Sequence, residues 1–388
     1  MKSLLLMSAL LLGATPVRFQ RHDIDDYPGG YQVAVADVNG NGKPDVIVLS
    51  TQENRVDWYE NPTFRRRLIA RADRGIDLAP LDLDGDGRAE IALASGFYYA
   101  DGNRGGQIQW LKSAASIEQP WQIHPIAVDP VVHRLRWGDL DGDGRPELIH
   151  APIFGPGSKG PAAVKPSHLW AFRVPRDPTS GAWETWKIDE SLTVLHGLYV
   201  GDLDGDGRAE VLTASFEGIH WFDFDGDPKT GKWRKTHIAP GAPPVNDRPG
   251  AARGSSEVVP VRLGGRSLAI AAIEPWHGHQ VVVYARDEKG RRWTRRVLDD
   301  TLREGHALLA ADLDGDGQEE IVAGWRGGGG GLALYDPLDP AGTRFRKVLI
   351  DQPIAVEGAV AADLNGDKRL DLVAIAGRSN KLVWYQRQ

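Results

Sequence analysis

The sequence predicts an all-β fold, a seven-bladed β-propeller, on three observations. An aspartate-rich loop motif returns along nearly the whole chain of 388 residues. Strand-like apolar segments precede and follow each copy of this motif. Dividing residues 17–388 into seven repeats gives about 53 residues per repeat, which is the size of one propeller blade. A repeat that covers this much of the chain indicates one closed domain.

The loop motif carries the ligands of a hard cation. It reads DLDGDGRAE at residues 202–210, with side-chain oxygens at positions 1, 3, 5 and 9 and a backbone carbonyl available at position 7. An EF-hand would place its last acid at position 12 between helices, whereas this motif lies between strands. A solvated acidic turn would not need four oxygens at fixed offsets. We therefore predict six structural calcium sites, one for each copy of the motif.

The predicted calcium ligands occupy the same four positions in every copy. They are Asp37, Asn39, Asn41 and Asp45; Asp82, Asp84, Asp86 and Glu90; Asp139, Asp141, Asp143 and Glu147; Asp202, Asp204, Asp206 and Glu210; Asp312, Asp314, Asp316 and Glu320; Asp363, Asn365, Asp367 and Asp371.

Each repeat is predicted to contain four strands. Strand A precedes the loop, strand B follows it, strand C is apolar and aromatic, and strand D is amphipathic and exposed. A seventh repeat at residues 257–274 keeps strands A and B but has lost the acids. The last repeat has no strand D, while residues 17–24 form an unpaired one, so we expect the N-terminal strand to complete the last blade and close the ring.

The composition and the N-terminal residues indicate where the protein acts and which partners are excluded. The net charge of −7 and the pI near 5.9 give no support to nucleic-acid binding, and cysteine is absent. Residues 1–16 have the positive start and short apolar core of a secretory signal, and the apolar run is too short to span a bilayer. We predict a secreted or periplasmic monomer without membrane insertion. The alternative is a cytoplasmic protein with an apolar N-terminal tail.

The face opposite the calcium loops is the predicted functional face. There the residues six positions before each loop should point toward the propeller axis, and the ends of the B strands reach the same face. The first series comprises Tyr31, Ile76, His133, His196, Glu257, His306 and Glu357. Three histidines and two glutamates in one register favour a polar pocket at the channel mouth, although each histidine taken alone could be a structural hydrogen-bonding residue.

From these positions we predict nine catalytic residues and four substrate-binding residues. The catalytic set is His133, His196, His306, Glu257, Glu357, Glu274, His277, Arg134 and Arg326. The substrate-binding set is Tyr98, Phe154, Trp276 and Trp325, aromatic side chains that could equally belong to the core. The five glycines at 327–331 fit a close-approach hairpin better than a phosphate-binding loop.

Such a pocket supports two chemistries. Neutral imidazoles and a carboxylate could hold one further divalent metal with open positions for a substrate oxygen. Alternatively, a histidine could remove a proton α to a carbonyl while a tyrosine, another histidine or a glutamic acid protonates the leaving hydroxyl. Serine hydrolase, nucleotide-binding and zincin motifs are not found in the sequence.

Two resemblances add to this interpretation. The D-x-D-x-D-G-x-x-[DE] loops resemble FG-GAP/VCBS repeats, which implies a propeller and calcium but says little about function. The stretches around His133, His196, His277, His306 and Trp325 are similar to the propeller domain of aldos-2-ulose dehydratase, also active on 1,5-anhydro-fructose. That similarity implies a carbon–oxygen lyase that eliminates water from a keto-sugar.

Two hypotheses remain at the level of sequence. The first is a secreted, calcium-stabilised sugar dehydratase that acts on a carbohydrate-like small molecule at the channel mouth. The second is a non-catalytic propeller that binds a glycan or a protein.

Overall fold

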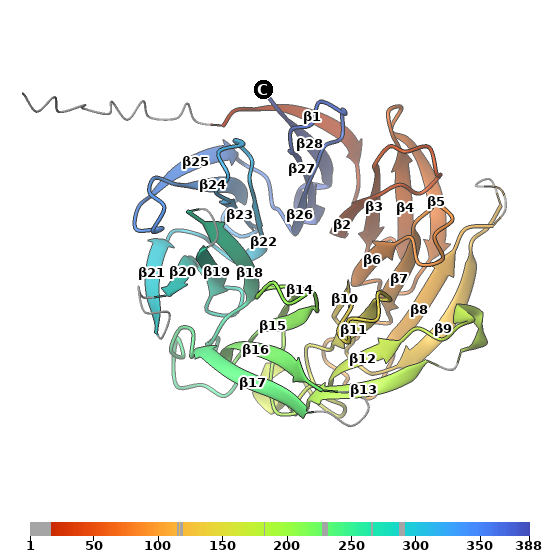
Figure 1. Cartoon of the computed structure of the whole chain (residues 1–388), viewed down its shortest axis with the longest axis horizontal. Helices are drawn as coiled ribbons and strands as arrows, with labels where there is room; N and C mark the ends of the chain where they lie inside the picture. Colours follow the sequence, from red (N-terminus) through yellow and green to blue (C-terminus); the bar gives the residue numbers. More distant parts are fainter. Residues whose placement is uncertain are drawn as a thin grey trace, which may run out of the picture.

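The computed structural model describes residues 17–114, 116, 119–181, 183–226, 232–264, 267–286 and 292–388. Seven four-stranded antiparallel sheets are arranged around a central axis (Figure 1). The all-β, seven-bladed fold predicted from the sequence is therefore confirmed. The predicted signal segment, residues 1–16, lies outside the described residues. Within the described part of the chain, no helix has both the length and the apolar character needed to cross a bilayer.

Each blade runs from the axis outward through its four strands. The innermost strands are β2 (Gly30–Ala36), β6 (Asp77–Leu81), β10 (Arg134–Gly138), β14 (Gly197–Gly201), β18 (Glu257–Leu263), β22 (Gly305–Ala311) and β26 (Gly358–Ala362). The second strands are β3 (Asp45–Ser50), β7 (Glu90–Ser95), β11 (Glu147–Ala151), β15 (Glu210–Ser215), β19 (Ser267–Glu274), β23 (Glu320–Trp325) and β27 (Asp371–Ala376).

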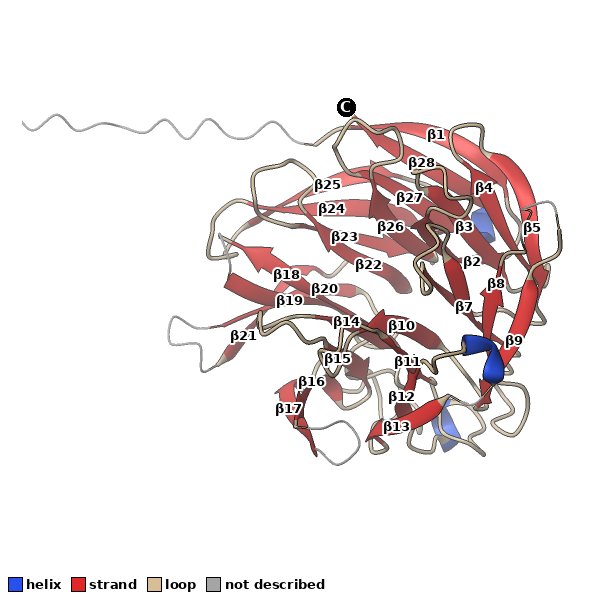
Figure 2. Ribbon diagram, turned by 45° about the vertical axis from the view of Figure 1, so that its right-hand side comes forward, coloured by secondary structure: helices blue, strands red, loops and turns tan. Residues whose placement is uncertain are grey.

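The third strands are β4 (Arg55–Glu60), β8 (Gln107–Lys112), β12 (Leu169–Arg173), β16 (Gly218–Asp225), β20 (Gln280–Arg286), β24 (Gly331–Pro337) and β28 (Lys381–Arg387). The outer strands are β5 (Arg65–Arg71), β9 (Gln122–Val128), β13 (Glu184–Asp189), β17 (Lys232–Ala239), β21 (Trp293–Asp299), β25 (Phe345–Asp351) and, at the chain start, β1 (Phe19–Asp26). Three short 3₁₀ turns, Pro161–Ala163, Pro178–Ser180 and Gly377–Ser379, complete the described elements (Figure 2).

The last blade is built from both ends of the chain. Strand β1 pairs antiparallel with β28, from Phe19 opposite Arg387 to Asp26 opposite Lys381 (Figure 1). The sheet order is β1-β28-β27-β26, so the first strand of the chain is the outer strand of the seventh blade.

The core lies between neighbouring blades. Strand β3 is buried at every position and reads DVIVLS, without the apolar–polar alternation of a half-exposed strand, because both of its faces pack against other strands. Two tryptophans at equivalent places on the third strands, Trp58 and Trp110, are among the largest fully buried side chains. This packing holds the seven innermost strands, and the residues at their starts, around the axis.

A buried histidine in the fourth blade links stability to pH. Burial, with Lys235 and His237 nearby, lowers the pKa of His220 to about 4. The unfolded chain would bind the proton near pH 6.5, so this contribution to stability is complete above that pH and is lost as pH falls toward 4.

We expect the unfolding free energy of His220→Gln to decrease less than that of the wild type as pH falls. Between pH 6.5 and 4 the wild-type protein should lose up to about 3 kcal/mol more unfolding free energy than the variant. Urea unfolding at a series of pH values measures the difference. Parallel pH profiles for the two proteins would contradict the role assigned to His220.

Candidate functional site

Four histidines meet at the axis of the propeller. We call His133, His196, His277 and His306 the histidine cluster. His133 and His196 immediately precede β10 and β14, and His306 lies at the start of β22. His277 comes from the turn after β19, where it has a left-handed backbone with φ 48°. Because these strand starts lie at the end of the innermost strands opposite the A–B hairpins, one register position supplies most of the cluster.

The cluster is tightly packed and removed from solvent. The ring centroids of His133 and His196 lie 4.6 Å apart, and those of His196 and His277 lie 4.7 Å apart. His306 lies 5.4 Å from both His196 and His277. His133, His196 and His306 are each at most 2% exposed. The cluster is therefore a buried layer in which the loss of hydration governs protonation.

Hydrogen-bond partners define which ring nitrogens carry protons. The Nδ1 atoms of His196 and His306 lie 3.1 and 2.6 Å from the carbonyl oxygens of Ser256 and Glu357, so each nitrogen must donate. The Nε2 atom of each of these two rings is then left with a lone pair.

His277 has the opposite arrangement. Its Nδ1 lies 3.4 Å from the guanidinium of Arg326, which can only donate. The Nε2–H of His277 therefore donates to Nε2 of His196 over 3.0 Å. The cluster thus has a defined set of donors and acceptors.

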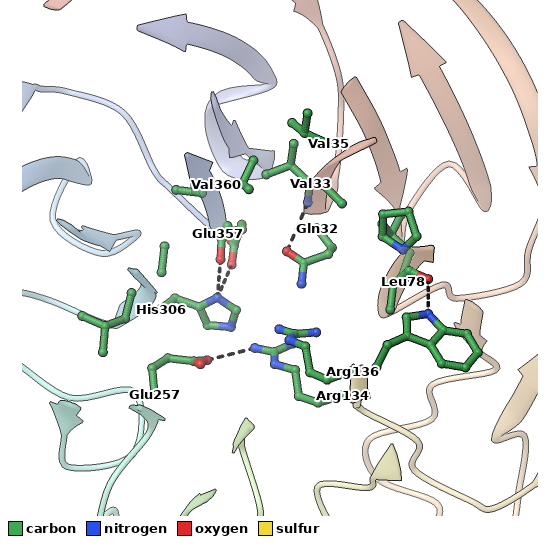
Figure 3. A pocket seen from close by; sticks show the side chains of 18 residues that line it. Gln32, Val33, Val35, Leu78, Arg134, Arg136, Glu257, His306, Glu357 and Val360 are labelled. Atoms are coloured by element: carbon green, nitrogen blue, oxygen red, sulfur yellow. Dashed lines mark hydrogen bonds and ion pairs between the residues drawn. The ribbon is translucent and has the colours of Figure 1, made fainter. Parts of the chain in front are cut away.

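Two ion pairs hold the cluster in place. The guanidinium of Arg134 lies 2.9 Å from Glu257, whose carboxylate also lies 3.0 Å from Nδ1 of His196. Arg326 lies 2.7 Å from Glu357. Glu357 also neighbours His306, as Figure 3 shows. The paired charges are buried or nearly so, and every one of these carboxylates and guanidiniums has a partner.

Burial keeps the imidazoles neutral. It lowers the pKa of His133 and of His306 well below their ordinary values, and Arg134 and Arg326 respectively add to the effect. Burial and His196 do the same for His277. Burial opposes ionisation of Glu257, but Arg134 and His196 outweigh it and lower the pKa of that carboxyl. At neutral pH the cluster therefore contains free imidazole bases beside an ionised carboxylate.

Tyr31 joins the cluster, although no role was predicted for it. Its hydroxyl lies 3.1 Å from Nε2 of His306 and 3.5 Å from Nε2 of His133, and burial raises the pKa of the phenol. The signal was present in the sequence, because Tyr31 occupies the same register position as His133 and His306 in its own repeat. An aromatic residue at a strand start is easily assigned to the core.

A cavity of about 400 Å³ borders the cluster. His306, Glu257, Glu357 and Arg134 line it (Figure 3). Val35, Pro80 and Val360, which lie farther along the innermost strands toward the A–B hairpins, line it as well. From the sequence we predicted a pocket only at the channel mouth on the face opposite the A–B hairpins. Small side chains on the inner strands leave this additional space, among them Ala34, Ala79 and Ala359. The volume is within the range of small-molecule sites.

Eight of the nine predicted catalytic residues come together, and Glu274 does not. Its carboxylate is fully buried in the fifth blade, where it accepts hydrogen bonds from Ser255, Tyr284 and Arg295. Glu274 ends β19 and its side chain points into the blade, whereas His277, three residues later, has turned toward the axis.

The four predicted substrate-binding aromatics are placed separately. Trp276 stacks on His277 at 4.6 Å and is the one that contacts the cluster. Phe154 is completely buried in an apolar group of loop residues. Tyr98 donates to Asp73 and lines a groove at the second blade, and Trp325 lines a cavity at the sixth blade. Ile76, in the same register as the histidines, is core.

The acidic hairpins bring their carboxylates together at the other end of the inner strands. Asp202, Asp204, Asp206 and Glu210 offer oxygens that all lie within 4.8 Å of one another. The sets Asp82, Asp84 and Glu90, Asp139, Asp141 and Glu147, and Asp312, Asp314 and Asp316 are arranged in the same way.

The hairpin backbone fixes this geometry. Asp202 accepts the backbone N–H groups of Gly205 and Gly207, and Glu210 accepts that of Leu203. Gly207 has φ 91°, a conformation that a side chain would strain. The hairpins that begin at Asp37 and Asp363 repeat these backbone hydrogen bonds with fewer carboxylates.

The last acid of each hairpin is the most buried one. Burial raises the pKa of Glu147 and Glu320 to about 8 and that of Glu210 to about 7. An ionised carboxylate at such a place needs a compensating cation. In the second hairpin the ammonium group of Lys112 contacts Asp84 and Glu90. The donor set, all oxygen, fits calcium or magnesium.

Comparison with known families gives a consistent result. Residues 105–287 match the sequence profile described as aldos-2-ulose dehydratase, beta-propeller domain, and residues 37–93 and 312–374 match the FG-GAP-like repeat. The chain resembles a sugar-dehydratase propeller. Both resemblances drawn from the sequence are therefore confirmed.

Among curated proteins, the aldos-2-ulose dehydratase of Phanerodontia chrysosporium is 25% identical over 298 residues. The match covers 70% of this chain and 32% of the relative, so the chain corresponds to about a third of that protein's length.

Two solved structures share the fold. An Agrocybe aegerita lectin that recognises non-reducing terminal N-acetylglucosamine aligns with a TM-score of 0.51 at 13% identity, over 83% of this chain and 80% of the lectin. BBS1N, in its complex with ARL6DN, aligns with a TM-score of 0.56 at 12% identity, over 96% and 97% of the two chains. At these identities the likeness shows the propeller architecture alone.

Glu257→Gln should destabilise the fold through Arg134. The Arg134 side chain is 5% exposed and would lose its charged partner, a change that costs about 3–5 kcal/mol in buried pairs. Urea unfolding of the variant measures the loss, with Glu190→Gln, an exposed pair with Lys187, as control. Replacing both partners, as Arg134→Met with Glu257→Gln, should recover most of it. Equal stability of Glu257→Gln and wild type would show that the pair is not needed.

Proposed function

We propose that the protein is a carbon–oxygen lyase that eliminates water from a keto-sugar at the histidine cluster. The observation that carries the proposal is a buried layer of neutral imidazoles, beside paired guanidiniums and a protonated phenol, at the end of a cavity of about 400 Å³. The similarity to the dehydratase propeller supports it, because His133, Arg134, His196, Glu257 and His277 all lie within the matched residues 105–287.

The reaction needs a base, an acid and a stabiliser of negative charge. A base removes the proton on the carbon next to the carbonyl, and the resulting enolate expels the β-hydroxyl as water, so one C–H and one C–O bond break while a C=C bond forms. The imidazoles are unprotonated at neutral pH, since burial lowers their pKa values. They are suited to accept the proton and are unsuited to act as the acid.

Tyr31 is the proposed acid. Its pKa is raised by burial, so the phenol keeps its proton, and its hydroxyl lies between His133 and His306. Arg134 and Arg326 lie beside the same layer and supply positive charge to the enolate oxygen. His306 lines the cavity and has a lone pair on Nε2, which makes it the proposed base when no metal is bound.

The cluster also fits a divalent metal. His196, His277 and His306 offer nitrogens within 4.8 Å of one another. Carbonyl oxygens hold the Nδ1–H groups of His196 and His306, which leaves Nε2 of both rings unprotonated, as in metal-ligating histidines. A metal held there would polarise the substrate carbonyl. In that arrangement His133 is the imidazole left to transfer the proton. Elemental mass spectrometry of wild type and His196→Ala distinguishes the two arrangements.

Turnover should depend on the cluster while folding does not. His306→Ala and Tyr31→Phe should each lower kcat on 1,5-anhydro-fructose at least a hundredfold, because general acid–base groups contribute about 10²–10⁴-fold. The readout is the absorbance of the unsaturated product, with circular dichroism to verify folding.

His237→Ala, an exposed histidine on β17, is the matched control for these variants and should keep wild-type turnover. If the wild-type protein gives no product but still binds the sugar, the alternative hypothesis of a non-catalytic glycan-binding propeller is correct. If His306→Ala folds and turns over normally, the cluster is structural.

We also propose that calcium occupies the acidic hairpins, that residues 1–16 direct export, and that the pairing of β1 with β28 closes the ring. The convergent carboxylates of four hairpins support the first part, and the β1–β28 ladder supports the last. Extracellular calcium concentrations suit weak sites made only of oxygen ligands.

Removing calcium should lower the stability of the protein. A site kept at about a hundred times its Kd contributes about 2.7 kcal/mol, so EGTA should lower the Tm by several degrees and calcium should restore it. Asp204→Asn should reduce the calcium-dependent part of the Tm shift. Asp225→Asn, an exposed acid outside the hairpins, should leave it unchanged. A Tm that is insensitive to EGTA in wild type would contradict calcium binding.

A further inference from the structure

A second cavity lies at the sixth blade, apart from the histidine cluster. Its volume is about 470 Å³, and it is formed where the connection from β21 to β22 passes the ends of β23 and β25. Six of the residues that line it are Thr301, Arg303, Trp325, Gly328, Lys347 and Gln352. None of them belongs to the proposed lyase site. Trp325 and Arg326 are consecutive, yet Arg326 pairs with Glu357 at the axis while Trp325 lines this cavity.

The glycine run at 327–331 forms one wall of the cavity. Gly328, Gly329 and Gly330 all have positive φ, and a Cβ at Gly328 would lie 2.7 Å from Cδ of Arg303. Side chains at these positions would fill the space beside Arg303. The backbone N–H groups of Gly328 and Gly329 have no acceptor among the described residues. The close-approach hairpin expected from the sequence therefore borders an outer cavity and presents two free donors.

The polar groups of the cavity are mainly hydrogen-bond donors. Trp325 is only 8% exposed, and its side chain lines the cavity. The guanidinium of Arg303 is exposed and has no carboxylate partner in the described part of the chain. Lys347 is paired with Asp299, 2.5 Å away, and that carboxylate also accepts from Thr301. No acid is among the described lining residues, so the cavity favours an anion rich in acceptors.

The surroundings of these donors suit a sugar ring. Trp325 gives an apolar wall, and the side chains of Thr301 and Gln352 offer hydrogen bonds to hydroxyls. A guanidinium binds a carboxylate through two parallel hydrogen bonds, which a hydroxyl cannot reproduce. We propose that this cavity binds an acidic sugar residue, with its carboxylate on Arg303 and its ring beside Trp325. The site is independent of the chemistry proposed for the histidine cluster.

Isothermal titration with D-glucuronate tests the site, with D-glucose and inorganic sulfate as comparison ligands. Wild-type protein should bind glucuronate saturably and glucose at least about tenfold more weakly, because the charged hydrogen bonds to the guanidinium are lost. Sulfate should also bind more weakly than glucuronate, since it has no ring to contact Trp325. Binding of sulfate as tight as that of glucuronate would show a simple anion site and overturn the assignment to a sugar.

Variants locate the binding. Arg303→Gln should weaken glucuronate binding at least about tenfold, and Trp325→Phe, which keeps the ring but removes the N–H, should weaken it less. Arg65→Gln makes the same charge change at an exposed position on β5 and should have no effect. No saturable binding by wild type, or equal losses in Arg303→Gln and Arg65→Gln, would overturn the proposal. Turnover of 1,5-anhydro-fructose by Arg303→Gln should match wild type, so a failure of this site is separable from a failure of the lyase.

Discussion

The arrangement of the innermost strands and the histidine cluster depends on two buried ion pairs. Arg134 with Glu257 joins the third and fifth blades, and Arg326 with Glu357 joins the sixth and seventh. Each pair also neighbours a histidine, since Glu257 contacts His196 and Glu357 contacts His306. Separating one partner would leave a charge without hydration, so the pairs restrict the innermost strands to one arrangement. The orientation of the histidine cluster follows from that restriction.

The same burial sets the protonation of the cluster. Imidazoles that lose hydration and face guanidiniums remain neutral at pH values where an exposed histidine would begin to bind a proton. A layer of neutral nitrogens is equally suited to proton abstraction and to metal ligation, which explains why one site supports both arrangements of the proposed lyase. Tyr31 differs because burial makes a phenol hold its proton more strongly, and this is why it is the group proposed to protonate the leaving hydroxyl.

The two ends of the innermost strands have opposite electrostatic demands. At one end, guanidiniums and carboxylates are balanced within the protein. At the other, the hairpin carboxylates converge with few cationic neighbours, and their burial raises the pKa of Glu147 and Glu320 to about 8. Only an added cation or a proton can relieve that second end. This asymmetry supports the two proposals that calcium binds at the hairpins and that the lyase reaction takes place near the strand starts.

The fold could be predicted from the sequence because its turns and strands are determined by short, repeated segments. The nine residues of the hairpin motif determine the turn and the positions of its oxygen side chains, and the spacing between copies gives the repeat length. The apolar segments on either side predict the strands. The register of His133, His196, His306, Glu257 and Glu357 was readable for the same reason, because each lies at a constant offset from a motif. Repetition along the chain therefore determined the seven blades and most of the polar layer.

The surroundings of individual side chains could not be predicted from the repeats, because they depend on the tertiary structure. Glu274 and His277 are three residues apart, yet one is satisfied inside its blade and the other reaches the axis, because the turn between them reverses the chain. Trp325 faces an outer cavity and Phe154 a loop core, since those surroundings come from residues distant in sequence. The cavity beside the histidine cluster likewise depends on small residues contributed by several blades. The sequence determined which side chains share a register, and the arrangement of the seven blades around the axis decided which of them touch.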